Sequence, residues 1–113
     1  MPSDLTIVAS ESTWIVRADG AILAETRRAI ELREGDRPPV VYIPREDVAM
    51  AFFEPSPTRT ASPRMGPARH FSFVGRDGEV RDAAWSYEAP EGSVAGIAGH
   101  LAFREGCLTV QRA

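Results

Sequence analysis

Turn signals divide this chain of 113 residues into short runs that favour β-strands. The run at residues 13–18 leads directly into Asp19-Gly20, and Arg76-Asp77-Gly78 follows the run at residues 70–74. Asp-Gly between apolar runs is a strong hairpin signal. Eight or so short strands joined in this way predict two packed antiparallel sheets, with a small open barrel as the alternative. With no repeat and no linker, residues 1–113 are predicted to form a single domain.

The expected strands follow the apolar and alternating runs. They are residues 5–9, 13–18, 21–24, 40–43, 70–74, 79–87, 100–104 and 107–111, the last two forming a final hairpin. Residues 25–34 suit either a helix or a half-buried strand, because helix-forming residues coincide with an apolar alternation. The class is therefore mainly β.

Three further local features are expected between residues 45 and 85. Pro44 can open one short helix around residues 45–53, which Pro55 then ends. Residues 56–67 contain three prolines and a glycine and predict a loop. Val80 is out of phase with Ala83 and Trp85, which predicts a β-bulge near Asp82.

Composition excludes several classes of chemistry. Cys107 is the only cysteine, so an internal disulfide and a cysteine zinc framework are both excluded. All 13 basic residues are arginines, which excludes lysine-dependent phosphate loops and Schiff bases. The two histidines lie far apart in sequence, so we expect neither a metal nor another cofactor. The start of the chain lacks a signal-peptide pattern and no apolar run approaches the roughly 20 residues of a membrane span, so a cytoplasmic location without membrane contact is expected.

The net charge of −3 is unevenly distributed. Residues 55–81 carry five arginines against two acids, a local balance of +3, whereas the remainder carries −6. An acidic chain binds duplex nucleic acid poorly, because that affinity comes mainly from phosphate neutralisation. The local excess could instead hold one small anion, although a solvated arginine-rich loop is the more common outcome.

Three segments resemble the domain-of-unknown-function 427 family, which also carries a nucleotidyltransferase-like label. The residues Val41-Tyr42-Ile43-Pro44-Arg45-Glu46-Asp47-Val48 resemble its YYxPREDV segment, Asp82-Ala83-Ala84-Trp85-Ser86-Tyr87-Glu88 its AAWxYxxP segment, and Ile97-Ala98-Gly99-His100-Leu101-Ala102-Phe103 its IAgxvAF segment. The resemblance covers roughly residues 14–110 and implies a β-rich two-sheet or tent-like fold, with a strand at residues 28–34. It implies no function, because the family is itself uncharacterised.

The chain departs from the family in the central segment. Many members carry Thr-x-Cys-Pro-x-Lys-Gly, and the matching residues here are Thr60-Ala61-Ser62-Pro63-Arg64-Met65-Gly66. Ser62 stands in place of the cysteine and Met65 in place of the lysine. Thiolate or amine chemistry is therefore not expected at these positions, whereas anion binding by hydroxyl groups is still open.

Candidate site residues follow from these patterns. Arginines suit bidentate phosphate or carboxylate binding, hydroxyl groups can donate to an anion, and aromatic rings on one strand face can stack on a flat ligand. On this basis the ligand-binding candidates are Arg45, Arg59, Thr60, Ser62, Trp85 and Tyr87. Asp47 and His100 are candidates for acid–base catalysis, although a helix-start carboxylate and a core histidine are the more common roles.

Three functional hypotheses remain open from the sequence. The first is a binding module for a small anionic or nucleotide-like ligand. The second is a hydrolase or transferase that uses Asp47 and His100 with arginine stabilisation of charge. The third is a structural or homodimerising domain without catalysis.

Overall fold

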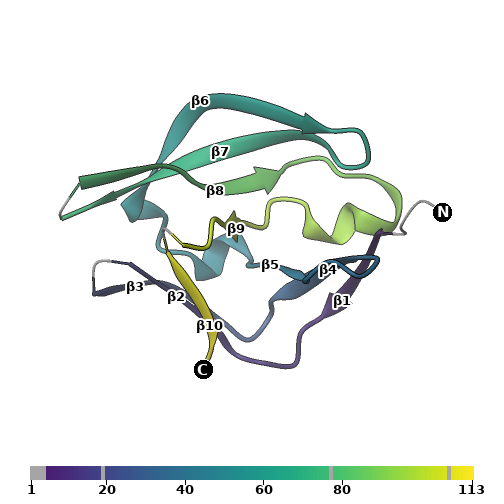
Figure 1. The fold of residues 1–113 in the computed structure, drawn as a ribbon, viewed down its shortest axis with the longest axis horizontal. Coiled ribbons are helices and arrows are strands. Elements are labelled where there is room, and N and C mark those ends of the chain that lie inside the picture. The colour runs from purple at the N-terminus through teal and green to yellow at the C-terminus, as the bar shows by residue number, and fades with distance from the viewer. Residues whose placement is uncertain (1–4, 19, 77, 107) are drawn as a thin grey trace.

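Antiparallel strands make up most of the fold. The computed structural model describes residues 5–18, 20–76, 78–106 and 108–113, and Figure 1 shows their arrangement. Within these residues ten strands form three antiparallel sheets, which confirms the mainly β class but gives three sheets in place of two. No helix among the described residues is long and apolar enough to cross a bilayer.

The sheets contain three, three and four strands. The first has the order β1 (Leu5–Ala9), β4 (Ile30–Glu34), β5 (Val40–Tyr42). The second has the order β10 (Thr109–Arg112), β2 (Trp14–Ala18), β3 (Ala21–Thr26). The third has the order β6 (Phe53–Ser62), β7 (Gly66–Gly75), β8 (Gly78–Tyr87), β9 (Ala102–Phe103). Figure 1 shows the four-stranded sheet above the two smaller ones.

A single bridge joins the first sheet to the third. Ile43 and Leu101 pair as an isolated antiparallel bridge, and each backbone N–H donates to the other residue's carbonyl at 2.8 Å. Because the contact is one residue long, β5 and β9 lie side by side without merging into one ladder. This junction brings the segment Pro44-Arg45-Glu46-Asp47 beside the loop that carries His100.

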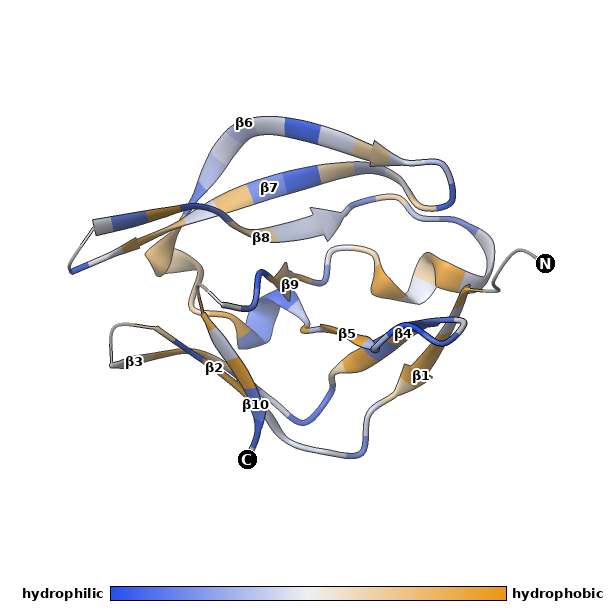
Figure 2. Ribbon diagram, in the orientation of Figure 1, coloured by the Kyte–Doolittle hydropathy of each residue, from blue (hydrophilic) through white to orange (hydrophobic). Residues whose placement is uncertain are grey.

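Two apolar cores lie on opposite sides of this junction. Neighbouring residues alternate between them: Ile43 and Leu101 belong to the first core, whereas Tyr42 and Ala102 belong to the second. The first core packs against β2 and β3, and the second packs against β1, β4 and the 3₁₀ segment η3 (Gly92–Ile97). Figure 2 shows apolar bands on β1, β4 and β5 and polar bands midway along β6 and β7. Period-two alternation therefore decides which of the two cores each side chain enters.

Most local predictions are confirmed. Ala18 pairs with Ala21 and Gly75 with Gly78, so both Asp-Gly hairpins form, although Asp19 and Asp77 themselves lie outside the described residues. The ambiguous segment at residues 25–34 contains the end of β3 and the whole of β4. Asp82 has a φ of 53° at a register shift between β7 and β8, which confirms the predicted bulge.

The predicted helix at residues 45–53 is wrong in kind. Two short 3₁₀ turns, η1 (Arg45–Asp47) and η2 (Met50–Phe52), stand in its place. Val48 between them is extended because it bridges Ala24, and Ala49 N–H donates to the carbonyl of Leu23 at 2.7 Å. Pairing with β3 therefore overrides the local helical preference.

The predicted loop at residues 56–67 is also wrong, because most of it belongs to the long β6–β7 hairpin (Figure 1). Strand β6 is an edge strand, where proline can be accommodated because one side of the strand makes no ladder bonds. The hydroxyl groups of Ser56 and Thr58 both donate to the Asp82 carboxylate. These bonds tie the irregular part of β6 to the bulge in β8.

The predicted final hairpin does not form. Strand β9 pairs with β8, whereas β10 pairs with β2 in another sheet. The two runs are adjacent in sequence, but each finds a partner from elsewhere in the chain. The apolar pattern identifies them as strands without identifying those partners.

Candidate functional site

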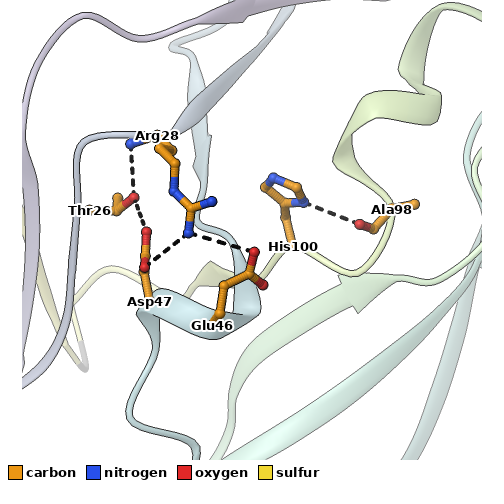
Figure 3. A network of polar contacts seen from close by, with 6 residues as sticks. All are labelled: Thr26, Arg28, Glu46, Asp47, Ala98 and His100. Carbon is orange, nitrogen blue, oxygen red and sulfur yellow. Dashed lines mark hydrogen bonds and ion pairs between the residues drawn. The ribbon is translucent and has the colours of Figure 1, made fainter.

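Figure 3 draws both catalytic candidates: Asp47 belongs to a polar network around η1, whereas His100 makes a separate hydrogen bond to Ala98. Thr26 Oγ1 donates to Asp47 Oδ2 at 2.7 Å, and Arg28 Nη2 donates to Asp47 Oδ1 at 3.1 Å. Arg28 Nη2 also lies 3.6 Å from Glu46 Oε1. The hydrogen bond from Thr26, followed by that from Arg28, lowers the pKa of Asp47 below its usual value. A carboxylate held in its ionised form is a weak base near neutral pH.

His100 has a defined tautomer in the same neighbourhood. Its Nδ1 lies 3.1 Å from the carbonyl oxygen of Ala98, which can only accept, so Nδ1 carries the proton when the ring is neutral. The remaining ring nitrogen, Nε2, then has a free lone pair. No hydrogen bond joins His100 to Asp47 within the described part of the chain. A joint catalytic role for the two residues stays a prediction.

Replacing Asp47 by asparagine should lower stability near neutral pH by about 1–2 kcal/mol, because two hydrogen bonds to a charged acceptor become neutral ones. The lowered pKa means that the wild-type carboxylate stabilises the fold above its ordinary pKa and loses this effect as the pH falls through the folded-state pKa. The free energy of unfolding, measured with urea between pH 7 and pH 3, should therefore fall less steeply with decreasing pH in Asp47→Asn than in the wild-type protein. Glu46→Gln is the matched control, since its 3.6 Å ion pair is exposed. Equal flattening in both variants would contradict the assignment.

The structure spreads the predicted anion-binding residues over two places. Arg45 Nη2 donates to Glu88 Oε1 at 3.0 Å, beside η1. Arg59 Nη1 donates to two backbone carbonyls of β6. Thr60 Oγ1 lies 2.8 Å from His70 Nε2, and Ser62 Oγ accepts backbone N–H groups within its own turn. The hydroxyl groups of Thr60 and Ser62 thus have partners within the β6–β7 hairpin.

Trp85 lines a groove of about 280 Å³ where all three sheets meet, which we call the tryptophan groove. Trp14 from β2 forms another part of its wall. The full lining is Trp14, Pro39, Val40, Val41, Trp85, Phe103, Arg104, Glu105 and Val110. Trp85 is the one predicted binding residue among these. The lining combines aromatic and aliphatic side chains with two charged residues, as small-molecule sites commonly do.

Hydrogen bonds fix both indole rings of the groove. Trp14 Nε1 donates to Ser10 Oγ at 2.8 Å, and Trp85 Nε1 donates to the Tyr42 hydroxyl at 3.2 Å. The N–H edges are therefore occupied, and what the rings offer a ligand is apolar surface. The guanidinium of Arg112 lies 5.4 Å from the centre of the Trp14 ring. Arg104 Nη2 donates to the Arg81 carbonyl at 2.8 Å, beside the groove.

A comparison with protein-family models finds a match over residues 6–112 to a family described as a domain of unknown function, DUF427, and labelled NTP_transf_9. The chain belongs to the DUF427 family. No curated protein matches it.

Within this DUF427 domain, the family's cysteine and lysine positions lie at the turn of the β6–β7 hairpin. Met65 packs against the second core together with Trp85 and Tyr87. The place of the lysine is thus taken by an apolar side chain in contact with that core. Tyr87, the other predicted stacking residue, belongs to the same cluster and does not line the tryptophan groove. Burial raises the pKa of its hydroxyl.

Sequence reasoning missed Trp14 as a site residue of the DUF427 domain. Trp14 lies in β2 and Trp85 in β8, and only the packing of the three sheets places them on one groove. No local pattern in the sequence distinguishes Trp14 from an ordinary core residue of a strand. Among residues 5–18, 20–76, 78–106 and 108–113, no three His, Cys, Asp or Glu side chains are grouped to hold a metal ion.

Proposed function

We propose that this DUF427 domain binds a small, flat, negatively charged ligand in the tryptophan groove. The observation that carries the proposal is that Trp14 and Trp85, from two different sheets, line one groove of about 280 Å³. A cavity of roughly 150 Å³ is enough to hold benzene. The groove therefore suits a one- or two-ring system such as a nucleobase.

The chemistry of the lining supports a ring with an anionic substituent. Indole rings stack on any nucleobase, because the attraction depends on the π-face that all bases share. The groove is bordered by Arg104, and Arg112 lies over Trp14. Within the lining, Arg104 balances the one carboxylate, Glu105, and Arg112 beside the groove adds a further positive charge. A carboxylate or phosphate projecting from the ring would meet this positive edge.

A catalytic role is less well supported. Its proposed base, Asp47, accepts hydrogen bonds from Thr26 and Arg28, which lower its pKa and occupy both of its oxygens. General-base catalysis favours a pKa near the working pH. The geometry therefore favours a structural role for Asp47, which links η1 to Thr26 at the end of β3.

Tryptophan fluorescence tests the proposal directly, because both tryptophans of the chain line the groove. Titration with adenosine monophosphate, adenosine and inorganic phosphate should give saturable quenching with the first, weaker binding of the second and no quenching with the third. Trp14→Leu should weaken binding about 5- to 100-fold, corresponding to loss of about 1–3 kcal/mol of stacking. Arg104→Gln should weaken binding of the monophosphate but not of adenosine.

Matched controls separate binding from general effects. Arg76→Gln removes an exposed arginine that is not part of the groove lining and should leave the affinity unchanged. A thermal shift of the wild-type protein should accompany the quenching, since a ligand of the native state raises the melting temperature. The proposal fails if neither fluorescence nor melting temperature responds to adenosine monophosphate or to indole-3-acetate, a second flat anion.

A further inference from the structure

A second polar cluster lies on the opposite face of β8 from the tryptophan groove. Successive residues of a strand point to opposite faces, so Ser86 faces away from the side on which Trp85 lies. Ser86 is fully buried, and its hydroxyl has no hydrogen-bond partner among the described residues. Within the same part of the chain, the Nε of Arg45 is likewise buried without a partner. Buried polar groups nearly always have partners, so two such groups in one region indicate a missing one.

Both groups lie near Phe71 and Ala84 of the first core. Phe71 pairs with Ala84, and Ser86 lies two residues further along the same face of β8. The guanidinium of Arg45 lies 5.5 Å from the centre of the Phe71 ring and also donates to Glu88. Phe71 lies opposite Ala84, two residues before Ser86, and Glu88 follows Ser86 by two residues, so the contacts of Arg45 lie on both sides of the Ser86 position.

Arginines gather at this place without enough acids to balance them. Arg69 pairs directly with Ser86 across the sheet, and its guanidinium lies 5.9 Å from the centre of the Phe71 ring. Arg59 is in turn the cross-strand partner of Arg69. Like charges directly opposite one another on a sheet are unfavourable. Among the described residues, Arg45 has the single ion-pair partner Glu88, and neither Arg69 nor Arg59 has a carboxylate within 4 Å.

We propose that Arg45, Arg69 and Ser86 form a binding site for a single oxyanion group, a phosphate or a carboxylate. One oxygen of the anion would accept from Arg45 Nε and the Ser86 hydroxyl, and the guanidinium of Arg69 would hold a second oxygen. The ring of Phe71 forms the apolar side of the site. Arg69 is exposed and Arg45 half-buried, whereas Arg45 Nε and the Ser86 hydroxyl are both buried. The two guanidinium groups would therefore form the solvent side of the site, and Ser86 its inner side.

This oxyanion site extends the proposed function and stands on separate observations. The tryptophan groove rests on ring stacking, whereas the oxyanion site rests on unpaired donors and unbalanced charge. Inorganic phosphate without a ring should therefore bind at Ser86 and leave tryptophan fluorescence unchanged. A negative result at one site therefore contradicts the proposal for that site alone.

Nitrogen-15 NMR of arginine side chains tests the site, because the Nε–H of Arg45 reports on its own partner. Titration with inorganic phosphate at constant ionic strength, set with chloride, should shift this resonance saturably, and acetate in a parallel titration distinguishes a general oxyanion site from a phosphate-selective one. Arg69→Gln and Ser86→Ala should each weaken phosphate binding at least 10-fold. Arg37→Gln, which removes an exposed arginine that is not part of the site, should leave binding unchanged.

Ser86→Ala also separates an oxyanion from a water molecule or an empty space. If the hydroxyl serves the anion, phosphate should raise the melting temperature of the wild-type protein and not that of Ser86→Ala. Equal stabilisation of both proteins by phosphate, or an Arg45 Nε–H signal that responds to neither phosphate nor acetate, would overturn the proposal.

Discussion

Replacing Phe73 by alanine should destabilise the domain by about 3–5 kcal/mol, the usual cost of removing a buried phenylalanine ring. Phe73 is 1% exposed in the middle of β7, and its ring centre lies 6.2 Å from that of Phe52 and 6.0 Å from that of Phe53. The ring of Phe53 lies in turn 5.9 Å from Phe103. Phe73 thus links β7 to η2 and β6, and Phe53 extends these aromatic contacts to β9. Urea unfolding would measure the loss as a lower midpoint at an unchanged slope.

The adjacent residue provides the control for this prediction. Val74 points to the opposite face of β7 and is 39% exposed, so Val74→Ala should cost well under about 1 kcal/mol. Domains of this kind are stable by only about 5–15 kcal/mol, so the two variants should differ visibly in melting temperature as well. If both variants lost similar amounts of stability, Phe73 could not be the centre of the aromatic contacts.

Local chemistry was enough to predict the parts of this fold that depend on neighbouring residues. The hairpins at Ala18–Ala21 and Gly75–Gly78 follow from turn residues that allow a positive φ, and Gly20 has a φ of 76°. The bulge at Asp82 follows from a change of phase in the apolar alternation. Both signals extend over a few residues, and no distant contact opposes them.

The errors arise where a distant partner decides the structure. Val48 lies in a segment with helical preference, yet its bridge to Ala24 makes it extended. The prolines of β6 indicated a loop, but at an edge strand tied to Asp82 they are compatible with pairing. The partner of β10 is β2, and nothing in either run specifies the other. Tertiary contacts override local propensity in each case.

The same distinction applies to the candidate sites. Trp85 could be recognised as a ligand-binding candidate from its own strand, but Trp14 required the packing of a different sheet. Arg45 was recognised from its motif, whereas Arg69 and Ser86 become notable only through the β7–β8 register and the absence of partners for buried groups. A sequence shows which residues could donate to an anion, and the structure shows which donors lack an acceptor.

Alkaline unfolding should depend on Tyr42, the largest fully buried side chain beside the tryptophan groove. Burial raises the pKa of its hydroxyl from 10.0 to about 12, an effect only partly offset by the hydrogen bond from Trp85.

The Tyr42 hydroxyl ionises near pH 10 in the unfolded chain but not in the folded one. The stability present below pH 10 should therefore fall by about 1.4 kcal/mol at pH 11 and continue to fall through pH 12. The chain has no lysine, so the two tyrosines are its side chains that ordinarily ionise near pH 10. Urea midpoints between pH 8 and pH 11.5 should show this loss in the wild-type protein and in Tyr87→Phe, and a much flatter profile in Tyr42→Phe. A profile that stayed steep in Tyr42→Phe would show that another group, not the hydroxyl bound by Trp85, causes the alkaline instability.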